Sequence, residues 1–236
     1  MNARLPLKFE VYAAHLSMIV YATHKGGKYL QLADSLKIDS TTPRGLYVNL
    51  TNRCNCDCVF CLRQKKSMAK ESSLWLEREP TIEEVKAELD AAPLQVIKEI
   101  VFCGFGEPTI RLAELIALLT YVKKIYPSMP TRLNTNGLGE LYHGREIAAD
   151  FKNILDTVSI SLNAATAEKY FKLTRAAYGI KSFDAMLTFA EHMKNFVPHV
   201  VLTVVDKVTP PEEITLCQKI CDERGLTLRV RPYEDS

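Results

Sequence analysis

Apolar and polar positions along this chain fall into alternating blocks, which predict strands and helices in regular succession. Short apolar runs with many β-branched residues are typical of strands that are buried on both faces. They occur at 46–50, 99–103, 131–135, 157–162, 200–205 and 226–230. Stretches with helical spacing of apolar residues separate them, at 82–89, 112–125, 146–155 and 182–196. A capping box at 81–84 marks the start of the first, and Pro211 and Gly225 mark the start and the end of a further helix. Six such steps predict an α/β fold with a parallel sheet, either doubly wound or curved toward a barrel.

The chain is predicted to divide into an N-terminal extension, residues 1–43, and a domain that holds the sheet, residues 44–236. Within the extension, 18–21 and 29–32 are β-prone runs separated by a glycine-containing turn, which predicts a β-hairpin. Residues 33–43 are expected to be a polar connector that ends at Pro43.

Composition narrows the class of protein. Of the 236 residues, 47% are hydrophobic, which is enough for a sizeable core. Lys and Arg total 30 against 28 acidic residues, so bulk charge gives no strong nucleic-acid signal, although a local basic patch stays open. No apolar run is long enough to span a membrane, and the N-terminus lacks a secretory signal pattern. The seven cysteines are therefore expected to be cytoplasmic thiols or metal ligands.

Four of these cysteines lie in one stretch, Cys54-Asn55-Cys56-Asp57-Cys58-Val59-Phe60-Cys61, directly after the first domain strand. Cys54, Cys58 and Cys61 have the spacing C-x3-C-x2-C. A [4Fe–4S] cluster commonly takes four thiolates, so a loop that supplies three leaves one iron open to another ligand. Zinc is the alternative, because a structural zinc site takes four ligands and Cys56 could be the fourth. The spacing favours the cluster, with Cys56 as a bystander.

This loop resembles that of the radical S-adenosylmethionine (SAM) enzymes. The resemblance implies an open, TIM-like (β/α)6 partial barrel with a [4Fe–4S] cluster and SAM as cofactors. It implies that the open iron binds the amino and carboxylate groups of SAM, and that Phe60 contacts the adenine. Reductive cleavage of SAM would then give an adenosyl radical that takes hydrogen from a substrate. The residues flanking Cys54 and Cys61, Leu50-Thr51-Asn52-Arg53 and Leu62-Arg63, look most like TatD family-associated radical SAM proteins.

A second motif follows the next strand, in Cys103-Gly104-Phe105-Gly106-Glu107. Two glycines let a backbone approach a ligand closely, and Glu107 offers an acceptor for a cation. The motif resembles the family's Gly-Gly-Glu turn, which receives the amino group of SAM, with Phe105 in place of the first glycine. The alternative is a tight turn before a helix, where an acidic residue is favourable in any case.

Polar residues also follow the next two strands. Asn134 and Asn136 come at the end of one strand, and Ser161 and Asn163 at the end of the other, where strand alternation predicts one shared face. These positions resemble the family's ribose and carboxylate regions. Arg175, one helix further on, could reach back as a fork for a carboxylate. The alternatives are ordinary turn chemistry for the four polar residues and a solvated helix position for Arg175.

The last strand carries Arg229 and Arg231, which alternation places on one face. If they point into the barrel, burial of two charges requires an anionic partner, and a substrate is the predicted one. If they point outward, helix acids are the expected partners. The remaining cysteines give weaker signals: Cys217 and Cys221 are expected in the core, and Cys103 either packs or faces the cavity.

The sequence thus predicts a radical SAM enzyme, an oxidoreductase that depends on iron, SAM and an external electron donor such as flavodoxin or ferredoxin. No second cysteine cluster follows the predicted barrel. The substrate is not identified by the sequence. Two alternatives stay open: an activase that makes a glycyl radical in a partner protein, and a non-catalytic zinc or iron–sulfur protein.

Overall fold

A computed structural model of the protein describes residues 19–24, 28–65 and 74–233. The strands in this part of the chain form one sheet in the order β2-β1-β3-β4-β5-β6-β7-β8. They are β1 (Val20–His24), β2 (Lys28–Gln31), β3 (Arg44–Val48), β4 (Ile97–Phe102), β5 (Thr131–Thr135), β6 (Thr157–Ser161), β7 (His199–Val205) and β8 (Thr227–Arg231). Strands β3 to β8 run parallel to one another, which confirms the predicted six-strand partial barrel.

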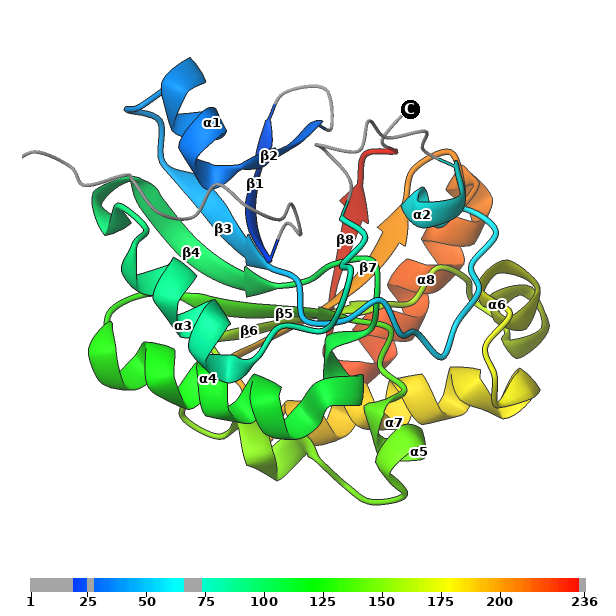
Figure 1. The fold of residues 1–236 in the computed structure, drawn as a ribbon. Coiled ribbons are helices and arrows are strands. Elements are labelled where there is room, and N and C mark those ends of the chain that lie inside the picture. The colour runs from blue at the N-terminus through cyan, green and yellow to red at the C-terminus, as the bar shows by residue number, and fades with distance from the viewer. Residues whose placement is uncertain (1–18, 25–27, 66–73, 234–236) are drawn as a thin grey trace, which may run out of the picture.

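The longer helices connect the parallel strands and cover the convex face of the curved sheet, whereas the first helix packs beside the hairpin and the second follows the cysteine loop (Figure 1). The helices are α1 (Leu32–Ile38), α2 (Leu62–Lys65), α3 (Ile82–Asp90), α4 (Leu112–Ile125), α5 (Gly139–His143), α6 (Ala167–Thr174), α7 (Ser182–Met193) and α8 (Pro211–Arg224). Several ends follow their sequence signals. Thr81 and Glu84 form the capping box of α3, and α8 begins at Pro211 and ends before Gly225, whose φ is 59°.

The two faces of the sheet differ in the kinds of side chain that they carry. Side chains on the convex face are fully buried against the helices, among them Leu46, Ile100, Leu133, Val158, Ile160 and Leu202. Residues paired in neighbouring strands point to the same face, so the register also defines the concave set. It includes Tyr47, Val101, Arg132, Asn134, Ser159, Ser161, Thr203, Arg229 and Arg231. The concave face is therefore polar, whereas the convex face forms the core.

The N-terminal extension adds the predicted hairpin to the sheet. Strand β1 pairs antiparallel with both β2 and β3, and Figure 1 shows the hairpin and β8 on opposite sides of the concave face. Residue 18, where the predicted hairpin begins, lies outside the described residues. Tyr21 stacks on Tyr47 of β3, with ring centroids 5.2 Å apart, and meets Tyr29 edge-on at 5.6 Å. The hairpin thus lines one wall of the opening.

One local prediction is incomplete and another is wrong. The stretch 33–43 contains helix α1, in which Asp34 near the start and Lys37 near the end form an ion pair of 2.6 Å. The helix predicted for 146–155 is absent; a 3-10 turn, Ala148–Phe151, stands there, and Asn153 has a φ of 64°. A residue in the left-handed conformation cannot continue an α-helix, so the helix is interrupted at Asn153. The apolar residues of this stretch pack from a compact turn instead.

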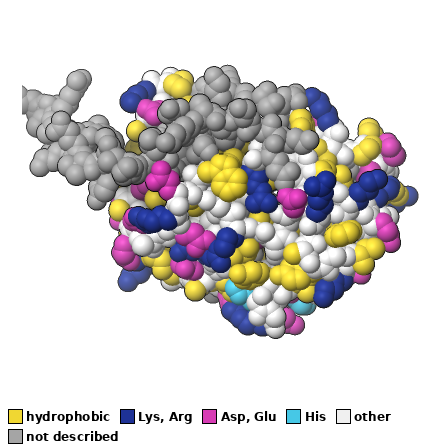
Figure 2. All heavy atoms as spheres, turned by 45° about the vertical axis from the view of Figure 1, so that its right-hand side comes forward, with side chains coloured by type: hydrophobic (Ala, Val, Ile, Leu, Met, Phe, Trp, Pro, Cys, Tyr) yellow, Lys and Arg dark blue, Asp and Glu magenta, His cyan; other side chains and the backbone are white. Residues whose placement is uncertain are grey.

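No helix in the described ranges is both long and apolar enough to cross a membrane. On the face shown in Figure 2, basic and acidic side chains of the described residues are interspersed.

Candidate functional site

The cysteine loop leaves the carboxyl end of β3 and separates its four thiols by burial. Cys54, Cys58 and Cys61 are half-buried, whereas Cys56 is 5% exposed and belongs to the hydrophobic core. The Cys56 thiol forms hydrogen bonds with Cys54 and Cys58, which raises the pKa of Cys56 and lowers that of Cys54. Among the described residues, no three His, Cys, Asp or Glu side chains are arranged to hold one metal ion.

The carboxyl end of helix α6 holds the cysteine loop in place. The backbone N–H of Asp57 donates to the Thr174 carbonyl at 2.9 Å, and that of Val59 to Leu173 at 3.0 Å. The last carbonyls of a helix have no partner inside the helix, so the loop satisfies both. From the other side, the Arg63 guanidinium donates to the Cys56 carbonyl at 3.1 Å. Two segments more than a hundred residues apart thus fix the loop.

The turn after β4 packs directly on the cysteine loop, and its glycines serve this packing. A Cβ on Gly106 would lie 2.2 Å from the Thr51 carbonyl oxygen and 2.5 Å from that of Arg53. A Cβ on Gly104 would lie 2.0 Å from Oδ1 of Asn49. Another part of the chain thus approaches closely at each of these glycines, and their predicted contact with a ligand stays a prediction.

Glu107 is 3% exposed, and donors of the protein surround its carboxylate. The N–H and hydroxyl of Thr109 donate to it at 3.1 and 2.8 Å, the Thr135 hydroxyl at 2.7 Å and the Asn136 N–H at 2.7 Å. Burial raises the pKa of Glu107, and these hydrogen bonds oppose the shift. Its side chain thus ties the ends of β4 and β5 together, and its predicted role as an acceptor for the amino group of SAM stays a prediction.

Aromatic side chains of the two motifs lie differently. Phe105 is 7% exposed and packs with Tyr21, Tyr29 and Leu74, so its ring faces the hairpin. The Trp75 ring meets it edge-on at 5.5 Å. Phe60 is half-buried in a turn where the Cys61 N–H donates to the Cys58 carbonyl at 3.0 Å. Only Phe60 therefore stays beside the cysteines.

Asn136 connects β5 to the cysteine loop. Its Nδ2 donates to Oδ1 of Asn55 at 2.5 Å and lies 3.8 Å from the Cys54 sulfur. Asn134 is half-buried on the concave face and hydrogen-bonds to the Cys103 thiol, whose pKa is raised by burial. Ser161 is also half-buried on this face. The structure therefore brings these three predicted residues to the carboxyl edge near the two motif loops.

Asn163 and Arg175 both stand at loop positions with positive φ, and their predicted contacts with the cofactor stay predictions. Strand β6 ends at Ser161 and Asn163 has a φ of 60°, so strand alternation does not extend to it; it is 2% exposed. Its carbonyl accepts a hydrogen bond from Thr209 at 3.0 Å. Arg175 ends α6 with a φ of 46°, and its exposed guanidinium meets Asp57 of the cysteine loop at 3.5 Å. Both residues shape loops in this structure.

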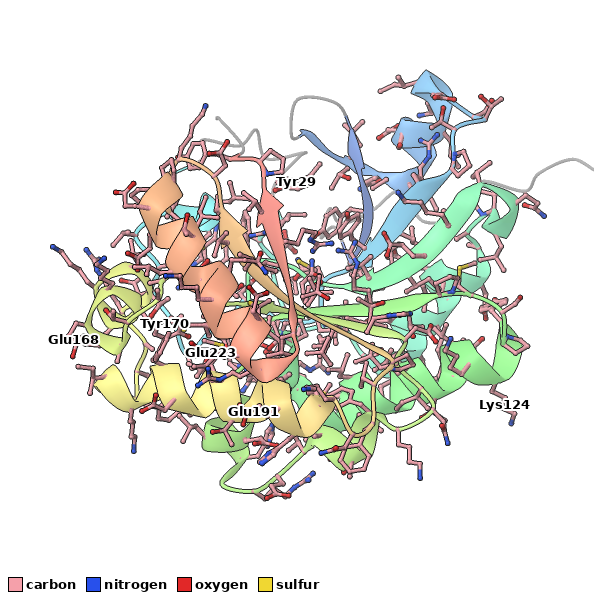
Figure 3. The ribbon with its side chains drawn as sticks, turned by 180° about the vertical axis from the view of Figure 1, so that it is seen from behind. Tyr29, Lys124, Glu168, Tyr170, Glu191 and Glu223 are labelled. Carbon is pink, nitrogen blue, oxygen red and sulfur yellow. The ribbon has the colours of Figure 1, made fainter. Side chains whose placement is uncertain are left out.

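One residue near the cysteines escaped the sequence analysis. Tyr170 of α6 is fully buried, and its hydroxyl has no hydrogen-bond partner among the residues that the structure describes. Figure 3 shows Tyr170 on the inward side of α6, whereas Glu168 points away from the body. Burial raises the pKa of Tyr170, and the nearby thiols of Cys56 and Cys58 raise it further. In the sequence, Tyr170 looks like an ordinary apolar position of a helix, so nothing indicated that it lies beside the cysteines.

Deeper on the concave face lies a group of charged residues that sequence analysis found only in part. Arg229 donates to the Ser159 hydroxyl at 3.2 Å, and its neighbours include Arg132, Arg231 and Glu99. Burial and the two arginines lower the pKa of Arg229. The register thus resolves the orientation of Arg229 and Arg231 in favour of the concave face. The sequence analysis missed Arg132, although it lies two residues before Asn134 on β5 and therefore points to the same face of the sheet.

The curved sheet, with a cysteine loop at the end of its first parallel strand, defines the radical SAM class of fold. The sequence profile of the radical SAM superfamily matches residues 48–218, and the chain belongs to this superfamily.

Relatives include a GTP 3′,8-cyclase of Corynebacterium glutamicum, 32% identical over 221 residues, which are 88% of this chain and 55% of the relative. A second, from Streptomyces coelicolor, is 33% identical over 134 residues, 55% of this chain and 36% of the relative. The chain spans about half the length of the first of these relatives.

Solved structures share the fold. Streptococcus suis SuiB bound to S-adenosylmethionine has a TM-score of 0.60 at 18% identity, over 86% of this chain and 43% of that one. anSMEcpe with bound AdoMet has a TM-score of 0.57 at 20% identity, over 80% and 51%. The predicted superfamily is therefore confirmed, together with the cofactors that define it, a [4Fe–4S] cluster and SAM. The narrower resemblance to TatD family-associated proteins stays a prediction.

Proposed function

We propose that this protein is a radical SAM enzyme that takes hydrogen from a small substrate held on the concave face of the sheet. When bound, the cluster and SAM supply an adenosyl radical for this step. The observation that carries the proposal is the direct contact between the two motif loops at the mouth of a polar concave face. There, the Glu107 N–H donates to the Arg53 carbonyl, one residue before Cys54.

In this proposal Cys54, Cys58 and Cys61 hold the cluster. They are the half-buried thiols of the loop, whereas Cys56 packs in the core. A [4Fe–4S] cluster is ligated at separate irons, so its cysteines need not converge on one point. The unpartnered Tyr170 hydroxyl beside these thiols fits a bound group with acceptor sulfurs, because a buried donor without a partner is costly. The donor set therefore suits the cluster.

The SAM contacts we propose come from the edge that joins the loops. The carbonyls of Gly104, Phe105 and Gly106 would accept from its amino group, and Phe60 would lie against its adenine. Asn134, Asn136 and Ser161, which stand at the same edge, would bind the ribose and carboxylate. Glu107, Asn163 and Arg175 would act indirectly, since each already holds a loop through contacts with other residues of the protein.

Arg229 and Arg231 are the proposed substrate anchors. They lie on the concave face, where Arg229 is half-buried and Arg231, the last residue of β8, is exposed. The names of the curated relatives, GTP 3′,8-cyclases, make GTP one substrate worth testing for this chain. A flavodoxin or ferredoxin is the proposed source of the electron.

Fractionated cell extract tests this function against the activase alternative. The protein is kept anaerobic with SAM and a reductant. GTP, the small-molecule fraction of the extract or its protein fraction is then added, and the amount of 5′-deoxyadenosine formed is measured. The proposal predicts that GTP or the small-molecule fraction raises 5′-deoxyadenosine above the substrate-free level. An increase from the protein fraction alone, with a glycyl radical signal in electron paramagnetic resonance, would contradict it and favour the activase.

A further inference from the structure

We propose that the concave face binds a phosphoryl group of the substrate, between Arg229 and Arg231 and beside an arginine, Arg132, that is already neutralised. The inference rests on the proposed function, because it names the substrate class of the same site. Its basis is the charge balance of the concave face and the contacts of these side chains.

Arg132 and Glu99 form the fixed part of this site. Nε and one terminal nitrogen of Arg132 each lie 3.0 Å from a different oxygen of Glu99, a two-point pairing of guanidinium and carboxylate. The exposed fractions of the two side chains are 12% and 24%. A partly buried pair of this geometry cancels its own charge and is rigid. Arg132 therefore positions its neighbours more than it attracts an anion.

Arg229 and Arg231 lack such a partner. The only polar contact of Arg229 among the described residues is the neutral Ser159 hydroxyl, and its Nε is buried without a partner. Among the same residues, Arg231 pairs with no carboxylate. Arg229 is half-buried and lies near the exposed Arg231 and near Arg132, and a half-buried cation beside other cations costs free energy unless an anion joins it. These two guanidinium groups are thus available to an incoming ligand.

The charge count favours a dianion over a carboxylate. Three arginines against the single Glu99 leave two positive charges on this face within the described strands. A phosphate monoester carries about −1.5 to −2 near neutral pH and would balance both, whereas a carboxylate would leave one cation unpaired. Guanidinium forks also match the geometry of phosphate oxygens. We therefore assign this subsite to a phosphoryl group.

Tyr47 adds an apolar boundary next to this charge. Its ring lies over Gly45, where a Cβ would come within 3.1 Å of the ring and 3.6 Å of Glu99. The ring is stacked on Tyr21 of the hairpin, which holds its plane. The phosphoryl site therefore has a flat aromatic wall on its hairpin side.

Isothermal titration calorimetry with inorganic phosphate tests the inference, with acetate at matched ionic strength as the competing anion. The sample is the anaerobically reconstituted protein. Arg229→Gln should weaken phosphate binding roughly 10- to 100-fold, the loss expected for a charge-assisted bond. Arg145→Gln, which removes an exposed arginine paired with Asp150, is the matched control and should bind phosphate like wild type.

A third variant tests the charge balance with the opposite sign. Glu99→Gln frees the Arg132 charge, so phosphate should bind several-fold more tightly. Iron content and visible absorbance show that each variant is folded and loaded. Equal phosphate affinity in Arg229→Gln and Arg145→Gln would overturn the inference, as would weaker binding in Glu99→Gln. Acetate binding as tight as phosphate would overturn the phosphoryl assignment.

These outcomes are separate from those of the proposed function. If the wild-type protein forms 5′-deoxyadenosine but does not bind phosphate, only the phosphoryl inference is refuted. If the wild-type protein binds phosphate but never forms 5′-deoxyadenosine, the proposed function is refuted, and the substrate assignment that rests on it is refuted as well.

Discussion

The backbone N–H of Glu107 donates to the carbonyl oxygen of Arg53 across 2.8 Å, which joins the turn after β4 to the residue that precedes Cys54. This bond spans two motifs that lie about fifty residues apart in the chain. It is possible only because Gly106 has no side chain, since a Cβ would meet the Thr51 and Arg53 carbonyls. The geometry of the cysteine loop therefore depends on the turn.

Gly106→Ala should damage the cysteine loop, because its Cβ meets backbone atoms that have no rotamer to move away. We expect a loss of about 1–3 kcal/mol in the free energy of unfolding, as for other overpacked sites. Less iron should also be incorporated on reconstitution. Urea denaturation of the apo-protein and iron analysis measure the two effects.

Gly104→Ala offers a matched comparison, because its Cβ meets a side chain, that of Asn49. Asn49→Ala should therefore rescue part of the loss from Gly104→Ala and none of the loss from Gly106→Ala, which a double-mutant cycle would reveal. A stable Gly106→Ala protein with full iron content would refute the dependence of the loop on this turn.

Tyr170→Phe should change the apo-protein and the cluster-loaded protein in different ways. The hydroxyl is buried without a partner, so its removal should leave apo stability unchanged or raise it by about 1 kcal/mol. If the hydroxyl donates to a cluster sulfur, it stabilises the reduced state, and its loss lowers the reduction potential. The expected shift is roughly 20–60 mV, from the free energy of one hydrogen bond.

A redox titration followed by electron paramagnetic resonance measures this shift. Tyr121→Phe is the control, because its hydroxyl bonds to Asp90 on the outer surface. An unchanged potential in Tyr170→Phe, together with a less stable apo-protein, would mean that the hydroxyl serves packing alone.

Periodicity predicted the architecture well because the convex face obeys it. Residues such as Ile100 and Val158 are buried at the spacing that their strands require. The prediction failed where backbone conformation departs from its neighbours, as at Asn153 and Asn163, both with positive φ. Nothing in the sequence distinguishes such asparagines from those that continue a strand or helix.

The site was predictable to the extent that its parts are local. The cysteine loop is one continuous stretch, so its spacing alone indicated a metal cluster. The pairing of Arg132 with Glu99 and the position of Tyr170 depend on contacts between distant segments. The glycines of the turn were recognised, but the atoms that they meet lie about fifty residues away. Their role therefore required the fold.

The cysteine assignment makes a simple prediction for iron content. Cys54→Ala, Cys58→Ala and Cys61→Ala should each fail to hold the cluster, whereas Cys56→Ala should retain about four irons per chain. Because Cys56 packs in the core, its variant should be less stable without losing iron. Iron and sulfide analysis after anaerobic reconstitution measures this. Loss of iron in Cys56→Ala with retention in Cys54→Ala would show that the ligand set is wrong.

Cleavage of SAM without added substrate is the most direct measurement of the central claim. The reconstituted protein is reduced anaerobically in the presence of SAM, and 5′-deoxyadenosine is quantified by chromatography. The account predicts that wild type forms 5′-deoxyadenosine and methionine in equal amounts and that Cys58→Ala forms neither. A wild-type protein that carries about four irons and yields no 5′-deoxyadenosine would contradict it, as would equal yields from Cys58→Ala.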